Sequence, residues 1–185
     1  GRLVREVSED CLHELVHFHD VYPLLSPWVL PPCHSSGIAV VMTCHDYRLT
    51  CPVVTHYSCW RLCTDCLGHS ELRCCLNNCR GNIEESVAFA ARSAVARLSN
   101  VVIDNVDVFV TATDFARSWL IEHRGILPNQ IETVPSSISV PEGASDPSRG
   151  EYVAFAGPFV GAKGIGGVLW ALRLPRLPLR SAGPH

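Results

Sequence analysis

The chain has 185 residues, enough for one well-buried domain or for one domain and part of a second. Apolar residues make up 47% of it and charged residues 18%, a composition that fits a globular protein and excludes a disordered one. The net charge is −3 and no Lys/Arg cluster forms a phosphate-binding face, so we expect no nucleic-acid partner.

The N-terminal residues carry no recognisable targeting signal. Residues 1–10 are charged and lack the apolar core of a secretory signal peptide. No stretch offers the roughly 20 uninterrupted apolar residues that span a bilayer. The sequence therefore predicts a cytoplasmic protein, in which disulfides are not the default state of its ten cysteines.

Apolar runs typical of buried strands alternate with helical patterns along residues 14–134. The predicted strands are 14–19, 38–43, 106–112 and 131–134, and the second is continuously β-branched or apolar. A helix is predicted over 82–98, because Asn82 is followed three residues later by Glu85. A second helix begins at Thr113 and ends before Gly125.

One composition break divides the chain. Pro, Gly, Ser and charged residues gather over 139–150, as in an interdomain linker. A strand over 152–157, a Gly-rich loop, a helix over 164–173 and a strand over 178–183 follow. The alternation predicts a parallel α/β sheet. We expect one domain over 1–140, a linker over 141–150, and over 151–185 the start of a second domain too small to form its own core.

A Cys/His-rich insertion covers residues 44–81. Cys63 and Cys66 form a C-x-x-C, with Cys51 twelve residues before it and Cys79 thirteen after it. The thiolates of these four cysteines would satisfy the tetrahedral coordination of a structural Zn²⁺. The alternative is a set of buried, reduced thiols that pack as small hydrophobes. Three further cysteines could substitute for any of the four: Cys59, Cys74 and Cys75.

Six segments, in this order, resemble glycosyltransferase family four. They are LVHFHDVYPLLSP, IAVVMTCHDYRLTCP, CTDCLG, CRGNIEES, VDVFVTATDFARSWL and YVAFAGPFVGAKGIGGVLWAL, which together cover about 15–183. The resemblance implies two facing Rossmann-like domains (the GT-B architecture), each a parallel sheet with helices on both faces. Residues 1–140 would be the acceptor-side domain and 151–185 the start of the sugar-nucleotide domain. Many relatives carry cysteines at the positions of Cys51, Cys63, Cys66 and Cys79.

The resemblance also implies an acceptor-side site. His45 follows the strand over 38–43 almost directly, and ligands of open parallel sheets bind beyond the carboxyl ends of strands. A His at the matching family position lies near the transferred sugar, so we assign His45 as the catalytic-site residue; otherwise it is a loop His bonded to Asp46. Asp46 and Arg48 are expected to shape the loop, and Thr113 to cap its helix or to contact a ligand.

Three further residues carry weaker signals than His45. His17 and His19 point to one strand face, because side chains alternate along a strand. A cleft contact for His19, or a structural hydrogen bond, is favoured over a metal pair. Ser136 stands where many family members carry Asn and receives no role.

The loop 157–164 is the candidate donor site. A Gly-rich turn between strand and helix presents backbone N–H groups to an anion, and Lys163 adds a point charge for a diphosphate. The predicted donor-binding residues are Gly157, Lys163 and Gly164. The family usually has an Arg directly after the first glycine, and this chain has Pro158, which supplies no cation.

The resulting functional hypothesis is a retaining hexosyltransferase fragment of polysaccharide biosynthesis. It would move a sugar from a nucleotide-diphosphate donor to a glycan or lipid-linked acceptor, with no cofactor required for catalysis. Because a lipid-linked acceptor lies in a membrane, the expected location of the chain includes the inner face of a membrane. Because the family's donor-binding glutamates are absent, we expect this chain alone to be inactive. The alternative is a non-catalytic binding module, truncated or Zn-stabilised; no oligomeric state is indicated.

Overall fold

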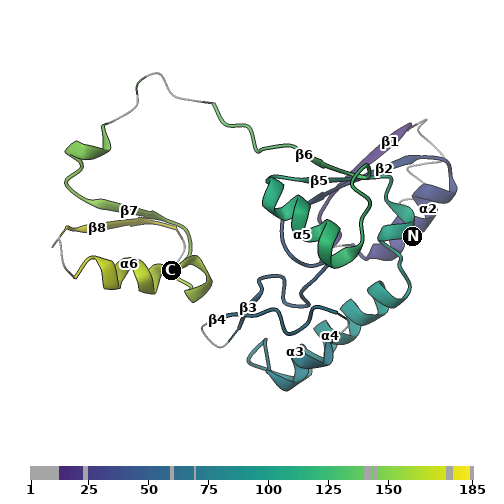
Figure 1. The fold of residues 1–185 in the computed structure, drawn as a ribbon, viewed down its shortest axis with the longest axis horizontal. Helices are drawn as coiled ribbons and strands as arrows, with labels where there is room; N and C mark the ends of the chain where they lie inside the picture. The colour runs from purple at the N-terminus through teal and green to yellow at the C-terminus, as the bar shows by residue number, and fades with distance from the viewer. Residues whose placement is uncertain are drawn as a thin grey trace. The chain divides into compact units, whose positions relative to one another are not determined.

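A computed structural model describes residues 13–22, 25–58, 61–68, 70–139, 143, 146–173 and 177–183 (Figure 1). The chain divides into two compact units, Gly1–Ser136 and Ser137–His185. The division falls at the start of the predicted composition break. Residues 141, 142, 144 and 145 of the predicted linker, and the charged N-terminal residues, lie outside the described ranges.

The first unit is built on a four-stranded parallel sheet. Its spatial order is β1 (Leu15–His19), β2 (Ala39–Cys44), β5 (Val108–Thr111) and β6 (Ile131–Thr133). Phe18 pairs with Met42, Met42 with Phe109, and Phe109 with Ile131. All four predicted strands are therefore present within a residue or two of their expected bounds, and the parallel α/β class is confirmed.

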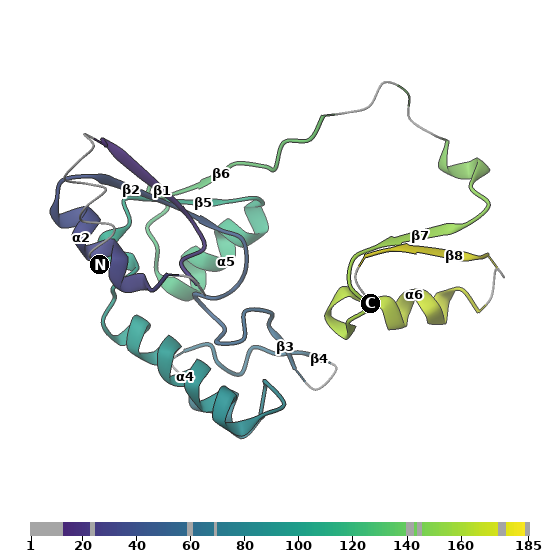
Figure 2. The same cartoon turned by 180° about the vertical axis from the view of Figure 1, so that it is seen from behind.

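One face of this sheet carries the hydrophobic core. Val40, Met42 and Phe109 are at most 1% exposed. The residues packed on them come from α2 (Leu30–Ser35), from α5 (Asp114–Arg124) and from the segment 101–106. Both views of the ribbon show α2 and α5 on the same side of the sheet (Figures 1 and 2).

The opposite sheet face is more open. Its residues alternate with those of the core: His17, His19 and Ala39 are exposed, and Val41, Val108 and Val110 are half-buried. Thr43 is the buried exception, at 8% exposure. Helices were expected on both faces; within the described ranges the core-forming helices pack on one. The two histidines of β1 lie on this second face.

Helix boundaries follow their capping residues. α4 (Ile83–Leu98) begins where the Asn82 side chain accepts a hydrogen bond from the Glu85 N–H at 3.1 Å. α5 begins where Thr113 accepts from the Ala116 N–H at 3.2 Å, and ends at Gly125, whose φ of 68° is left-handed. Among helices in the described part of the chain, none is long and apolar enough to cross a membrane.

Several short elements were not predicted. The Pro-rich segment forms a 3-10 turn at Pro27–Val29 that leads into α2. The Cys-rich insertion contains the hairpin of β3 (Tyr57–Ser58) and β4 (Arg61–Leu62), followed by α3 (Leu72–Leu76). A further 3-10 turn, Ile103–Asn105, precedes β5. The insertion is thus structured despite its weak periodicity.

The second unit is a small parallel β-α-β arrangement. β7 (Val153–Ala156) pairs in parallel with β8 (Leu179–Ala182). Between them lie a 3-10 turn at Gly161–Lys163 and α6 (Ile165–Ala171); another such turn, Pro147–Arg149, precedes β7. The predicted strand, loop, helix and strand are all present. The two strand ends approach closely, because the Gly157 N–H donates to the Ala182 carbonyl at 2.8 Å.

Candidate functional site

A cavity opens where strands β2 and β5 end, in the first unit. Its volume is about 330 Å³. The carboxyl ends of parallel strands are the usual place for ligands in open α/β sheets. The cavity is lined by the segment after β2, the start of α5 and one residue after β6, namely Cys44, His45, Asp46, Tyr47, Ala112, Thr113, Ala116, Leu120 and Ser136.

His45 links this cavity to the open face of the sheet. Its Nε2 lies 2.9 Å from Nδ1 of His19, and the two rings stack with centroids 5.2 Å apart. Both side chains are exposed. A hydrogen bond between two ring nitrogens needs one donor and one acceptor, so at most one of the two facing nitrogens carries a proton. The hydrogen bond therefore fixes the two rings relative to each other at the edge of the cavity.

His17 completes a group of three imidazoles. Its ring centroid lies 4.3 Å from that of His19, and its Nε2 bonds the buried Thr43 hydroxyl at 2.8 Å. Burial lowers the pKa of His17, and the positive charge that His19 or His45 would carry lowers it further. The lowered pKa favours the neutral imidazole, and the bond to Thr43 is a structural hydrogen bond between two strands.

Asp46 and Arg48 shape the loop after β2. The Asp46 carboxylate accepts from the Arg48 backbone N–H and from its Nε, both at 2.9 Å. Arg48 Nε also lies 3.2 Å from Asp20, which follows β1. The ion pairs tie the ends of the first two strands together.

Thr113 and Ser136 complete the far wall of the cavity. Thr113 is the N-cap of α5 and still lines the cavity, so the structural and ligand-facing interpretations are compatible. Ser136 is exposed and lies three residues after β6. Sequence reasoning noted it without a role, and its position beside Thr113 becomes apparent only once the strands are paired.

The four cysteines of the predicted Zn²⁺ set meet in the insertion. Cys51, Cys63, Cys66 and Cys79 line one small cavity of about 10 Å³, together with Cys74. Burial, and then the neighbouring thiols, raise the pKa of Cys66 to about 12. No three His, Cys, Asp or Glu side chains of the described residues are grouped closely enough to hold an ion as they stand. Cys59 lies outside the described residues.

Sequence reasoning missed a buried histidine that anchors the insertion. His56 is 7% exposed; its Nδ1 bonds the Cys63 carbonyl and its Nε2 the Thr50 hydroxyl, each at 2.8 Å. Trp119 of α5 donates to the same hydroxyl at 3.2 Å. Burial lowers the pKa of His56, so the neutral imidazole donates from Nδ1 and accepts at Nε2. No motif in the sequence marks this role.

The predicted donor loop lies in the second unit. Gly157 has a φ of 137° and Gly164 a φ of 76°, conformations that glycine adopts without strain. Lys163 is exposed at the end of the 3-10 turn, and the turn leads into α6 through Gly164. Pro158 directly follows Gly157 and adds no donor to the loop.

The comparisons with known proteins do not identify a family for the chain. No protein-family profile matches the chain, and no curated protein matches it.

Proposed function

We propose that the chain is part of a retaining, sugar-nucleotide-dependent glycosyltransferase of family four. In this proposal the first unit is the acceptor-side domain and the second begins the donor-binding domain. The observation that carries it is the cavity of about 330 Å³ beyond β2 and β5. Three residues that the resemblance assigns to the acceptor side line it: His45, Asp46 and Thr113.

The reaction would exchange one glycosidic bond for another. The bond between the sugar and the nucleoside diphosphate breaks and a bond to the acceptor oxygen forms. The proton of the acceptor hydroxyl passes to the phosphate oxygen of the departing nucleoside diphosphate. His45 would contact the transferred sugar, and His19 would fix the His45 ring through their shared hydrogen bond. Lys163 would offset the charge that develops on the leaving diphosphate. The acceptor would be a glycan or a lipid-linked sugar.

Donor binding tests the proposal directly. The 185-residue chain is titrated by calorimetry with the common sugar nucleotides, beside Lys163→Ala and the control Arg173→Ala, another exposed cation of the second unit. Binding that weakens about tenfold in Lys163→Ala only would support the donor loop. A folded chain that binds none of these nucleotides would overturn it.

Pro158 favours a second candidate, a binding module without turnover. One of the two cations that the family usually brings to the diphosphate is replaced by a residue with no donor. In the complete protein, binding of a sugar nucleotide without release of free nucleoside diphosphate, with or without acceptor, would support this candidate. Release of the nucleoside diphosphate at a measurable rate would support the enzyme.

A structural Zn²⁺ in the insertion belongs to the same proposal. Its support is that Cys51, Cys63, Cys66 and Cys79 line one cavity although 28 positions separate the first from the last. When bound, the ion would hold the insertion together and take no part in transfer. Elemental analysis of chain purified without added zinc should find about one equivalent, reduced in Cys66→Ser but not in Cys33→Ser. Less than about a tenth of an equivalent in the unaltered chain would rule the ion out.

A further inference from the structure

A second cavity, between α4 and the loop after β2, carries an unusual concentration of guanidinium groups. Its volume is about 40 Å³. Arg48, Arg92, Arg97 and Arg124 line it, with Glu71 as the carboxylate among the lining residues. It shares none of its lining residues with the His45 cavity. It is therefore a separate feature of the first unit.

Three buried guanidinium nitrogens in this cavity have no hydrogen-bond partner among the described residues. They are Nε of Arg92, Nη1 of Arg97 and Nε of Arg124. A buried donor attached to a charged group costs more when unpaired than a neutral one does. Three such donors, on two helices and all on residues that line this cavity, indicate that a further acceptor belongs there.

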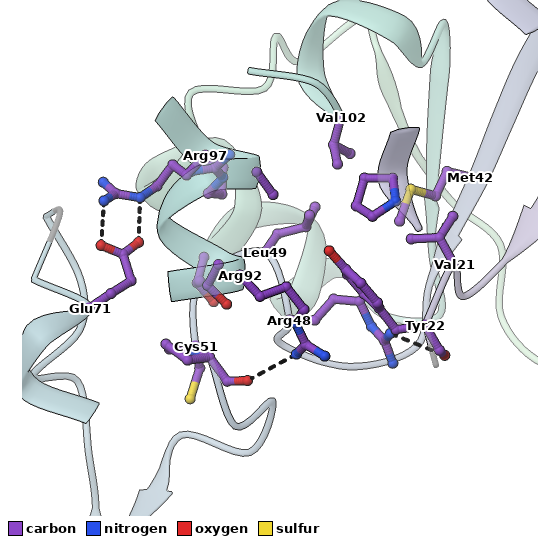
Figure 3. Close-up of a pocket in the computed structure, with 16 residues that line it drawn as sticks. Val21, Tyr22, Met42, Arg48, Leu49, Cys51, Glu71, Arg92, Arg97 and Val102 are labelled. Carbon is purple, nitrogen blue, oxygen red and sulfur yellow. Dashed lines mark hydrogen bonds and ion pairs between the residues drawn. The ribbon is translucent and has the colours of Figure 1, made fainter. Parts of the chain in front are cut away.

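The partners of each arginine show which guanidinium charges are neutralised by a carboxylate and which are not. Arg97 forms a two-fold ion pair with Glu71 (Figure 3). Arg48 is held by Asp46 and Asp20. Arg92 stacks on the Tyr22 and Phe89 rings and donates weakly to the Pro52 carbonyl at 3.5 Å. It has no ion pair within the described residues.

Arg124, at the end of α5, has neither a hydrogen bond nor an ion pair within the described residues. Burial lowers the pKa of Arg124, and the nearby charge of Arg97 lowers it further. A cavity of about 50 Å³, lined by Arg97, Arg124, Glu71 and His123, adjoins the same residues. The carboxylates present therefore leave two of the four guanidinium groups without an anion.

We propose that this cavity, which we call the arginine cavity, binds an oxyanion of the size of phosphate. Water could satisfy the free N–H groups but would not neutralise Arg92 and Arg124. A volume of about 40 Å³ holds roughly three water-sized spheres, which suits a tetrahedral oxyanion. Guanidinium groups recognise such anions through planar, charge-assisted hydrogen bonds. The proposal does not depend on glycosyl transfer.

Calorimetric titration of the 185-residue chain with inorganic phosphate, at constant ionic strength, tests the site. We expect saturable binding below about 10 mM phosphate, weakened at least tenfold in Arg124→Gln and in Arg92→Gln. The control is Arg73→Gln, an exposed arginine of the same unit, and should bind as the unaltered chain does. Arg124→Lys keeps the charge without the planar fork and should fall between the two.

Two results would overturn the proposal. One is no binding by the folded, unaltered chain; the other is equal binding by the Arg124, Arg92 and Arg73 variants, which would indicate surface charge alone. Circular dichroism establishes folding, and Arg92→Gln carries the test if Arg124→Gln does not fold. A parallel titration with glycerol phosphate identifies the source of the anion. Binding of the monoester favours a phosphate carried by an organic molecule, whereas binding of inorganic phosphate alone favours the free ion.

Discussion

His19 Nδ1 and His45 Nε2 lie 2.9 Å apart, so a residue of the edge strand β1 directly orients the residue that follows the neighbouring strand β2. Both rings are exposed, and such pairs contribute little to the free energy of unfolding. The contact is therefore better suited to positioning a ring at the cavity than to stabilising the sheet. Changes to His19 or His45 should therefore affect function more than stability.

Replacing His45 with Ala should leave the free energy of unfolding within about 0.5 kcal/mol of the unaltered chain. The same change should remove transfer activity in the complete enzyme if the proposed function holds. His19→Ala should reduce activity less, because it frees the His45 ring without removing it. Urea unfolding and release of nucleoside diphosphate are the two measurements. A His45→Ala enzyme of unchanged activity would exclude His45 from the reaction.

Mild acid should destabilise the first unit through His56. Its folded pKa lies below 6.5, so the unfolded chain binds more protons between those two values. The stabilisation is fully present above about pH 6.5 and is lost as the pH falls toward the folded pKa. His17, whose pKa is also lowered, acts in the same direction.

Urea unfolding between about pH 7.5 and pH 5 measures this dependence. His56→Gln should be less stable than the unaltered chain at neutral pH and should lose less stability on acidification. His34→Gln is the matched control, since it changes an exposed histidine of the same unit. An equal loss of stability on acidification in His56→Gln and in the unaltered chain would contradict the assignment.

The centre of the sheet should be the most sensitive position for packing. Phe109 is fully buried at 0% exposure, and its strand pairs with β2 on one side and β6 on the other. Phe109→Ala should cost about 3–5 kcal/mol. Leu62→Ala changes a side chain that is 85% exposed and should cost less than about 0.5 kcal/mol. Chemical denaturation distinguishes the two, and similar losses would contradict this location of the core.

Gly183 should tolerate no side chain. A Cβ there would lie 2.5 Å from the Gly157 carbonyl oxygen, and its φ of 145° is already strained for any other residue. Gly183→Ala should therefore destabilise the β7–β8 pair. Gly166→Ala, within α6 and with open space around its Cβ, should instead stabilise by about 0.5–1 kcal/mol. Hydrogen exchange of the β7 amides should report both changes, with opposite signs.

The sequence predicted those strands and helices that are specified by residues close together in the chain. A β-branched run marked β2, and the caps Asn82 and Thr113 marked the starts of two helices. α2 was missed because Pro31 and Pro32 suggest an irregular segment, although the first turn of a helix accepts proline. The short elements inside the insertion were missed because contacts such as His56 with Thr50 order them, and no hydrophobic period marks them in the sequence.

The candidate site could also be placed only in part from the sequence, because some of its contacts are long-range. His45 could be placed at a strand end from the sequence, but its contact with His19 requires the β1–β2 register. The arginine cavity collects guanidinium groups from α4, from the end of α5 and from the loop after β2. In the sequence, Arg92, Arg97 and Arg124 look like ordinary surface residues, and only Arg48 belongs to a motif. Long-range packing alone reveals that the four arginines line one cavity.

The described strands of the first sheet follow each other in space in the order in which they occur in the chain. Each strand therefore adds to an edge already exposed by the strand before it, and none has to be inserted between two that are already paired. During synthesis, the four described strands could pair one after another in this order. Among them, β1, which carries His17 and His19, would be made before the other three.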